Sequence, residues 1–450
     1  MSAASRARML RQHYLSPQLW QRRAGFWAGA LLVSLIAIFF AQAATLADSL
    51  FHLAIARNRF AALAIAPAGL ALSLLLTRLY FPGAQGSGIP QVIAATEMAS
   101  PAHIRAVLSL RIAFGKLLLT LLGLASGASI GREGPTVQVS AAILRAFGQW
   151  VGMPQARQMR ALVLAGGAAG IAAAFNTPLA GVLFSIEELS HSFEHRTSAT
   201  VVTAVIVAGI ATVAITGGGS YFGHNNAMLP VGSAWLAVVV CAIFGGLFGG
   251  LFSRLLLAAA YGLPGHAGRF VRKRPMAFAA LCGLALAALG LASGGATYGT
   301  GYAQARALVA GSADLPSYFF PLKLMATVVS YVSGIPGGIF APSLAVGAGL
   351  GRVIAYALPH APAGAVVLLG MVSYFSGVVQ APLTSAVIVM ELTDNQDMKI
   401  PLLAASFLAY GASRIVCRHA LYGALARRFL QAVEGPAPAV SGVLLDEADG

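Results

Sequence analysis

The stretch SIGREGPTVQ, Ser129–Gln138, places an arginine and a glutamate between glycines and a proline in one of the most apolar parts of the chain. Its surroundings recur later in the sequence. When Lys116–Arg145 is set against Lys323–Arg352, lysine, threonine, serine, glycine, proline and arginine residues coincide at a constant shift. A second block, Gly166–Glu187, matches Gly370–Glu391 with three residues of slippage. These matched charged residues and prolines predict two related halves in one chain.

The composition is that of an integral membrane protein. Hydrophobic residues make up 58% of the 450 positions, charged residues only 10%, and the mean hydropathy is +0.78, which is too apolar for a soluble protein of this length. The net charge of +15 does not indicate nucleic-acid binding, because the basic residues form short clusters between apolar segments. By the positive-inside rule these clusters face the cytoplasm. They are Arg6, Arg8, Arg11, Arg22 and Arg23, and then Arg269, Arg272, Lys273 and Arg274.

Glycine and proline interrupt many of the apolar segments, with 51 and 21 copies respectively. A bilayer tolerates such breaks only where protein or a water-filled cavity satisfies the freed backbone groups. The sequence therefore predicts an all-α polytopic membrane protein built from tilted and broken helices. Internal repeats of this kind are typical of secondary transporters, with the substrate site between the halves. Sequence alone leaves open whether the two repeats are parallel or inverted.

The membrane domain is expected to be a single unit. The first apolar run, Ala24–Leu46, is longer than the core of a signal peptide and is followed by further segments, so we expect an uncleaved helix. Further apolar segments are expected to include residues 55–80, 160–186 and 364–390. The predicted organisation is a cytoplasmic segment at 1–23, a membrane domain at 24–430 with halves at about 24–215 and 230–430, and a short tail at 431–450.

The repeat separates structural residues from functional ones. Glu187 and Glu391 match, and so do Lys116 and Lys323, so we interpret both pairs first as structural. Two carboxylates break the symmetry of the repeat. At the matched positions of the other half, Glu133 corresponds to a phenylalanine and Glu188 to a leucine. Polar residues that the repeat does not explain are candidates for function.

Three glycine-proline motifs predict helix starts that converge on an anion. They are GSGIP at 86–90, GREGP at 131–135 and GIFAP at 338–342. Proline suits the first turn of a helix. The unpaired N–H groups and positive dipole of a helix start attract anions, and partial charges hold an ion that must also leave. A carboxylate at such a start would occupy the place of a bound anion.

With these three motifs and Tyr422 in HALYGALARR, the chain resembles the CLC family of chloride channels and chloride/proton exchangers over residues 25–430. The resemblance implies an inverted repeat and a homodimer with one pathway in each subunit. It implies that Ser87 and Tyr422 offer hydroxyl donors to a central anion. The backbone around Gly88, Ile339 and Phe340 would supply N–H groups.

Two glutamates carry the functional expectations of this resemblance. Glu133 would be the gating carboxylate and the external proton carrier, and an unpaired Glu133 is favoured over one that pairs with Arg132. Glu188 would be the internal proton-transfer glutamate of exchangers, a position that is non-acidic in many channels. The alternative for Glu188 is a polar residue at the cytoplasmic helix end. We therefore expect exchange of chloride for protons, with a passive chloride channel of the same fold as the alternative.

Further expectations concern specificity and context. Ser87 resembles the chloride-preferring members, whereas Gln91 stands where many members have glutamate after GSGIP. The residues left after Phe429 are too few for a pair of regulatory CBS domains. A bacterial inner membrane, lipid contact and cytoplasmic termini are expected. A cluster of His191, Glu194 and His195 is expected to be a solvated loop.

Several other features do not suggest chemistry. Cys241, Cys282 and Cys417 lie far apart without CxxC spacing, so neither a disulfide framework nor a metal site is indicated, and no resident cofactor is expected. No HExxH or GxSxG motif supports an intramembrane enzyme. The glycines at 245, 246, 249 and 250 form overlapping GxxxG patterns that allow close helix packing and need not mark the dimer interface.

Overall fold

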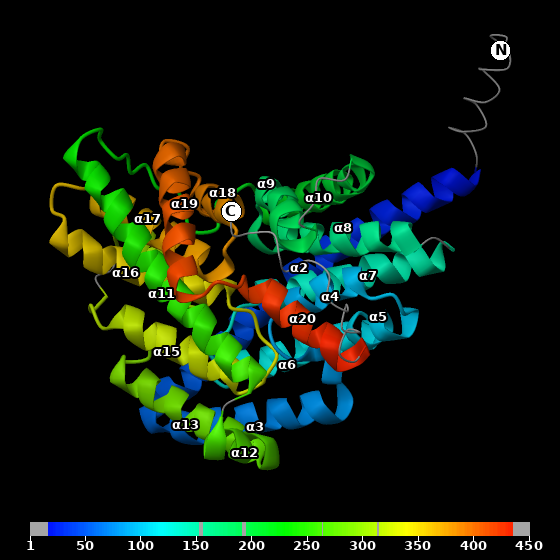
Figure 1. Ribbon diagram of the computed structural model, residues 1–450, viewed down its shortest axis with the longest axis horizontal. Helices are drawn as coiled ribbons and strands as arrows, with labels where there is room; N and C mark the ends of the chain where they lie inside the picture. The colour runs from blue at the N-terminus through cyan, green and yellow to red at the C-terminus, as the bar shows by residue number, and fades with distance from the viewer. Residues whose placement is uncertain (1–16, 153–155, 191–194, 263, 313–314, 435–450) are drawn as a thin grey trace, which may run out of the picture.

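The computed structural model describes residues 17–152, 156–190, 195–262, 264–312 and 315–434. The first half, drawn in blue to green in Figure 1, and the second half, in green to orange, lie side by side (Figure 1). The elements of the first half are α2 Pro17–Arg57, η1 Arg59–Ala61, α3 Ala62–Tyr80, η2 Pro82–Ala84, α4 Ile89–Glu97, α5 Pro101–Val107, α6 Leu110–Ala125, α7 Glu133–Trp150, α8 Ala156–Phe175, α9 Pro178–Phe184, the π-helix η3 Ser185–Ser190 and α10 His195–Thr216. Those of the second half are η4 Ser233–Trp235, α11 Leu236–Tyr261, α12 Gly265–Lys273, α13 Pro275–Ala292, α14 Tyr302–Val309, α15 Phe319–Val332, α16 Phe340–Ala357, α17 Ala363–Val379, α18 Pro382–Thr393, α19 Lys399–Val416 and α20 Leu421–Glu434.

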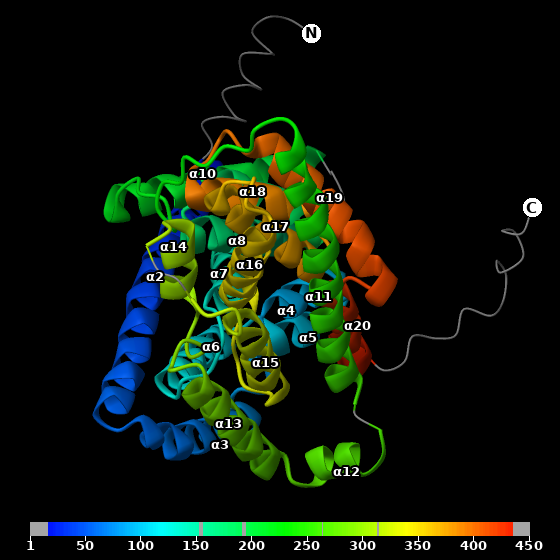
Figure 2. The same ribbon diagram turned by 90° about the vertical axis from the view of Figure 1, so that its left-hand side faces the viewer.

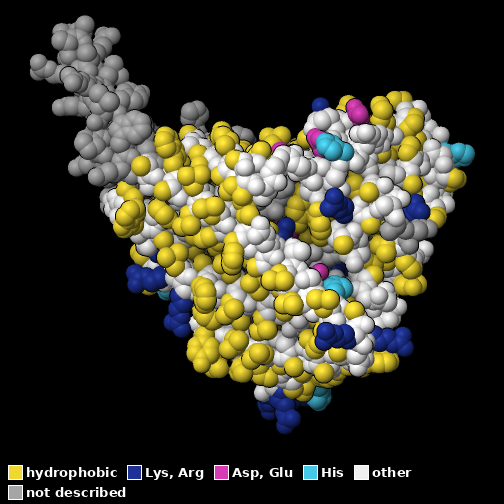
Figure 3. Space-filling view, turned by 180° about the vertical axis from the view of Figure 1, so that it is seen from behind, with side chains coloured by type: hydrophobic (Ala, Val, Ile, Leu, Met, Phe, Trp, Pro, Cys, Tyr) yellow, Lys and Arg dark blue, Asp and Glu magenta, His cyan; other side chains and the backbone are white. Residues whose placement is uncertain are grey.

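The fold is all-α and suited to a membrane. Among the described residues, eight helices are long and apolar enough to cross a bilayer, or up to nine if the bent pair α19 and α20 is one span. Their outward faces carry large apolar side chains, and much of the surface in Figure 3 is hydrophobic. By contrast, α17 is buried on every side from Ala365 to Val379, as expected for a helix that is apolar all round. The chain is a multi-pass membrane protein.

The predicted repeat is present, and it is inverted. Gly131 and Gly338, which match in the alignment, exchange both of their backbone hydrogen bonds at 2.7 and 2.8 Å in an antiparallel bridge. Equivalent residues that pair antiparallel are related by a local two-fold axis. The helices that follow them, α7 and α16, each contain 18 residues and begin at matched positions.

Each of the matched glutamates, Glu187 and Glu391, caps the start of a helix in the opposite half of the chain. Glu187 accepts hydrogen bonds from the backbone N–H groups of Leu383 and Thr384 at the start of α18. Glu391 accepts the equivalent bonds from the start of α9, at residues 179 and 180. Carboxylates at helix N-termini satisfy unpaired donors and the helix dipole. This arrangement accords with the structural interpretation of both glutamates.

The predicted segment boundaries were wrong in three places. The stretch 160–186 breaks into α8 and α9, and the stretch 364–390 breaks into α17 and α18. Each break follows a non-glycine residue in the left-handed region, Asn176 with φ 57° and Gln380 with φ 61°. The first helix continues to Arg57, so the segment expected at 55–80 begins only after it. Each break carries a polar residue and a proline, Asn176 with Pro178 and Gln380 with Pro382, and each proline opens the second helix of its pair.

The GxxxG glycines of α11 serve packing within the subunit. A β-carbon at Gly245 or Gly249 would collide with the backbone of α17, and one at Gly246 or Gly250 would collide with α19. Helix α11 therefore packs between α17 and α19, and its four glycines allow the backbones of these helices to approach closely. The side chains of the expected cluster His191, Glu194 and His195 lie outside the described residues, as do residues 1–16 and 435–450 of the terminal segments.

Candidate functional site

The three predicted helix starts meet at the boundary between the halves. Helices α4, α7 and α16 begin at Ile89, Glu133 and Phe340, directly after the predicted glycine turns. Gly86 accepts a hydrogen bond from Gly337 and donates one to the carbonyl of residue 335. The GSGIP turn is thereby tied to the segment that leads into α16, beside the Gly131–Gly338 bridge. The N-terminal N–H groups of three helices are thus gathered in one region, as an anion site requires.

Glycine makes this convergence possible. A β-carbon at Gly134 would collide with the Ser87 hydroxyl and would lie 2.8 Å from the Ser87 carbonyl oxygen and 3.4 Å from the α-carbon of Gly338. A β-carbon at Gly88 would lie 2.6 Å from the Gly134 carbonyl oxygen, and Gly88 has φ 111°, which favours glycine. The first turns of α4 and α7 therefore pack backbone to backbone.

The two hydroxyls predicted to bind an anion are buried beside these helix starts. Ser87 is 1% exposed and Tyr422 is fully buried, and neither hydroxyl has a hydrogen-bond partner among the described residues. The ring of Tyr422 stacks on that of Phe340 with 6.3 Å between centroids. The hydroxyls of Tyr422 and Ser87 lie close enough to interact with each other. Buried hydroxyls without partners are costly unless a ligand or water pairs with them.

Glu133 is buried at the first position of α7, and both of its carboxylate oxygens lack a hydrogen-bond partner among the described residues. A β-carbon at Gly131 would collide with one of these oxygens and lie 3.4 Å from the amide nitrogen of Ala341. The carboxylate therefore bends back toward the first turn of α16. A buried negative charge lies where the helix starts favour an anion.

Arg132 does not pair with this carboxylate. Its guanidinium donates to the carbonyl oxygen of Ala41 at 2.7 Å and to the hydroxyl of Tyr221 at 3.4 Å. It also lies over the Tyr221 ring, 5.8 Å from the centroid. Within the described part of the chain no ion pair joins Arg132 to Glu133. The described part of the structure therefore does not contain the alternative arrangement, a direct ion pair in which Arg132 neutralises Glu133.

Glu188 lies in the π-helix η3, where the chain departs from regular α-helical winding. Such turns often occur at functional sites. Glu188 is 2% exposed and its Oε1 atom has no hydrogen-bond partner among the described residues. Its neighbour Glu187 is instead held at the start of α18. The Tyr422 hydroxyl is within electrostatic range of both Glu188 and Glu133. The two symmetry-breaking carboxylates therefore share one buried neighbour.

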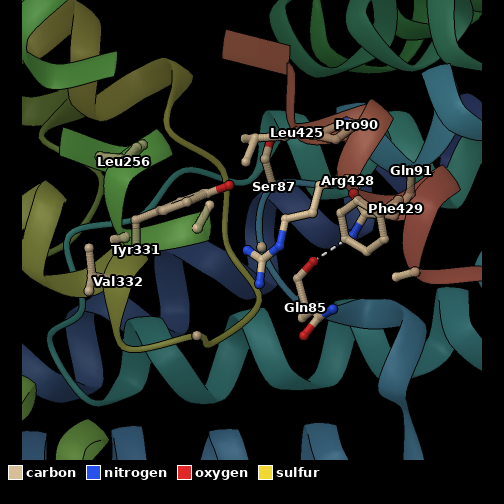
Figure 4. A pocket seen from close by; sticks show the side chains of 15 residues that line it. Gln85, Ser87, Pro90, Gln91, Leu256, Tyr331, Val332, Leu425, Arg428 and Phe429 are labelled. Carbon is tan, nitrogen blue, oxygen red and sulfur yellow. Dashed lines mark hydrogen bonds between the residues drawn. The ribbon is translucent and has the colours of Figure 1, made fainter. Parts of the chain in front are cut away.

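A pocket of about 270 Å³ opens beside Ser87. Figure 4 shows Arg428 of α20 extending across it between Tyr331 and Gln85. Sequence reasoning missed Arg428, although it ends the same motif that contains Tyr422. Its cationic side chain lines the approach to the Ser87 hydroxyl.

Gln91, the departure noted in the sequence, also lines this pocket. Its side-chain oxygen accepts from the Gly88 N–H at 3.1 Å, and its amide nitrogen donates to the Gln85 carbonyl at 2.5 Å. Gln91 therefore holds the GSGIP turn without bringing a negative charge beside Arg428. A glutamate could accept the first bond but could not donate the second.

The family model described as voltage gated chloride channel matches residues 68–414. The chain belongs to the CLC family. The H(+)/Cl(-) exchange transporter ClcA of Citrobacter koseri is 31% identical over 419 residues, which cover 89% of this chain and 86% of the relative. ClcA of Salmonella typhimurium is 32% identical over 368 residues, covering 79% and 76% of the two chains.

Solved CLC structures share the fold. A slow cyanobacterial Cl-/H+ antiporter superposes with a TM-score of 0.77 at 24% identity, covering 91% of this chain and 98% of the other. A CLC-type fluoride/proton antiporter superposes with a TM-score of 0.75 at 23% identity, covering 90% and 98%. The CLC architecture expected from the motifs is confirmed.

Proposed function

We propose that this protein is a secondary active transporter that exchanges chloride for protons across a membrane. The observation that carries the proposal is a set of buried polar groups at and near the converging helix starts, each with at least one atom that lacks a hydrogen-bond partner among the described residues. These are the hydroxyls of Ser87 and Tyr422 and the carboxylates of Glu133 and Glu188. The relatives named as H(+)/Cl(-) exchange transporters support the same conclusion.

The central anion is held by partial charges. Chloride lies between the hydroxyls of Ser87 and Tyr422 and the N–H groups around Gly88, Ile339 and Phe340. Its binding satisfies donors that would otherwise remain buried and unpaired. Because no lysine or arginine forms a direct salt bridge with the ion, the ion can leave. The pocket beside Ser87, with Arg428 in its wall, is the route by which chloride reaches this place.

Glu133 is both the gate and the external proton carrier. While ionised, its carboxylate competes with chloride for the positive helix starts. Protonation removes the negative charge, so the side chain leaves and chloride enters. One residue thereby alternates between blocking the anion path and carrying a proton.

Glu188 is the internal proton-transfer group. The repeat gives it leucine as its counterpart, so the fold does not need a carboxylate at this place. Its unpaired oxygen and its electrostatic proximity to Tyr422 support a proton route that leads from Glu188 toward Glu133. Chloride and protons are the transported ions, and no resident cofactor or metal takes part.

The protein acts in a bacterial inner membrane, with both termini in the cytoplasm, as a homodimer. Exposed apolar side chains on two helices support the dimer. This apolar face includes Ile206 and Ile210 on α10 and Phe407 and Leu408 on α19, and the two helices are connected through contacts of α9 with α18. Since α10 and α19 are matched by the repeat, this face suits an interface with a second copy. Cross-linking at Phe407→Cys in membranes would trap dimers if α19 lies at that interface.

The experiment that tests exchange uses purified protein in liposomes under a chloride gradient. Chloride efflux and external pH are recorded together for the wild type, Glu188→Gln and the matched control Glu391→Gln. We expect wild-type chloride movement to drive protons against their gradient. Glu188→Gln abolishes the driven proton movement while chloride still flows, whereas Glu391→Gln retains both. Chloride flux without driven protons in the wild type would instead identify a passive channel.

A further inference from the structure

Helix α12 carries a cluster of cations that the transport pathway does not use. Arg269, Arg272 and Lys273 stand at positions i, i+3 and i+4, which place them on one face of the helix, and Arg274 follows at the C-cap. All four side chains are exposed. Phe270 and Val271 lie on the other side of the helix, and Phe270 is 37% exposed. The helix is amphipathic, with a basic face and a short apolar face.

The position of α12 puts this cluster at a boundary of the membrane. It connects the end of one apolar span, Ser233–Tyr261, to the start of the next, Pro275–Ala292. Figures 1 and 2 both show α12 at the lower edge of the molecule, crossing between the ends of α11 and α13. In Figure 3 a dark-blue patch marks this edge below a broad yellow surface. Leu281 and Leu284 of α13 are exposed apolar side chains.

The described part of the protein provides no counter-charge for the cluster. The sequence contains no aspartate or glutamate from His195 to Ser312, a stretch that includes all of α11, α12 and α13. No ion pair to any of the four cations occurs within the described residues. Their counterions must come from outside this part of the chain. At a bilayer surface, the negative groups at the required depth are the phosphates of anionic lipids.

We propose that α12 and Arg274 form a docking surface for the headgroups of anionic phospholipids, which we call the α12 cluster. The basic face contacts the lipid phosphates while Phe270 and Val271 face the acyl boundary, as in other interfacial amphipathic helices. A site of this kind anchors the loop between two spans. It is independent of the chloride site and of whether transport is coupled to protons.

The test measures lipid preference directly. The full-length protein is reconstituted in vesicles of phosphatidylcholine and phosphatidylglycerol that contain a trace of spin-labelled phosphatidylglycerol or spin-labelled phosphatidylcholine. The motionally restricted fraction of each label reports its association with the protein. We expect the wild type to restrict the phosphatidylglycerol label more strongly. The fourfold variant R269Q/R272Q/K273Q/R274Q loses this preference, by up to roughly fivefold in relative association for each cation removed.

Two control variants separate local charge from general effects. R269K/R272K/R274K keeps the charge and is expected to keep the preference. R57Q/R59Q removes two exposed cations, one at the last residue of α2 and one in the turn that follows, and is expected to leave the preference unchanged. If the fourfold variant fails to fold, the pairs R269Q/R272Q and K273Q/R274Q replace it, each with a partial loss. Chloride uptake shows which variants are folded.

Three results would overturn the proposal. The first is equal restriction of the two labels by the wild type. The second is a preference that survives in the folded variants lacking the α12 cations. The third is displacement of the phosphatidylglycerol label by inorganic phosphate at constant ionic strength, which would identify the ligand as free phosphate and not lipid.

Discussion

Lys116 and Lys323 occupy matched positions in the two halves, yet only Lys323 lies within electrostatic range of a carboxylate. The ammonium group of Lys323 donates to the carbonyl oxygens of Thr297 and Gly299 at 2.9 and 2.8 Å, and Asp48 is its charged neighbour. A β-carbon at Gly299 would collide with the Asp48 carboxylate, so the three groups are closely packed. Lys116 has no charged partner among the described residues. The shared lysine is structural in both halves, but only one of the two charges is compensated.

A protonated Lys116 should strengthen chloride binding. Its ammonium group donates to the carbonyls of Ala84 and Gly86, directly before Ser87. At an effective dielectric constant of 20, a unit charge at roughly 10 Å contributes about 1–2 kcal/mol. We expect Lys116→Met to weaken chloride binding about tenfold, measured by titration calorimetry. Lys323→Met is the matched control and should leave the affinity within about twofold; equal losses in both variants would show that the effect is not electrostatic.

Replacing Glu133, the proposed gating carboxylate, should remove the pH dependence of chloride flux. In the wild type, chloride efflux should rise as the pH falls, because protonation neutralises Glu133 and frees the site. Glu133→Gln carries no charge at any pH, so its efflux should be constant and should not drive protons. The measurement is chloride efflux from liposomes over a series of pH values, with the exposed Glu97→Gln as control. A pH dependence that persists in Glu133→Gln would assign the gate to another group.

A methyl group at Gly134 should disrupt the meeting of the helix starts. Its β-carbon would collide with the Ser87 hydroxyl and press against the Ser87 carbonyl. Overpacking of this kind costs about 1–3 kcal/mol, and here it also displaces a proposed chloride ligand. We expect Gly134→Ala to lower both the thermal midpoint and the chloride affinity. Gly218→Ala, where nothing lies within 4 Å of the added carbon, should change neither.

The reciprocal caps predict equal losses of stability. Each of Glu187 and Glu391 accepts two backbone hydrogen bonds at a helix start, and hydrogen bonds to charged groups contribute about 1.5–3 kcal/mol. An amide offers only one acceptor oxygen and no charge. Glu187→Gln and Glu391→Gln should therefore lower the thermal midpoint by similar amounts, while Glu97→Gln leaves it unchanged. If one of the two proved neutral, the caps would not be energetically equivalent.

The sequence predicted the parts of the structure that depend on residue identity at fixed spacing. The glycine-proline motifs marked where α4, α7 and α16 begin, because proline and glycine restrict backbone conformation locally. The repeat marked Glu133 and Glu188 as asymmetric, and the structure leaves both with unpaired oxygens. Whether these glutamates act as proposed stays a prediction for the transport experiments.

Other features could not be predicted because they depend on tertiary proximity. Asp48 precedes Lys323 by more than half of the chain, and no local pattern links the two. Arg428 enters the site only because α20 packs beside the GSGIP turn. The helix breaks after Asn176 and Gln380 were missed for a different reason, because the apolar runs on either side outweighed the polar residue and the proline that mark each break.

The distance in sequence between Ser87 and Tyr422 also determines when the site is completed during biosynthesis. Ribosomes add about 5–20 residues per second, so roughly a minute or less passes between the synthesis of Ser87 and the synthesis of Tyr422. For most of that interval the nascent chain carries Glu133 and Lys116 without the helix that completes their surroundings. A polypeptide that stops in the second half before α20 lacks the second hydroxyl. Premature termination at any point before Tyr422 therefore yields a protein without a complete anion site.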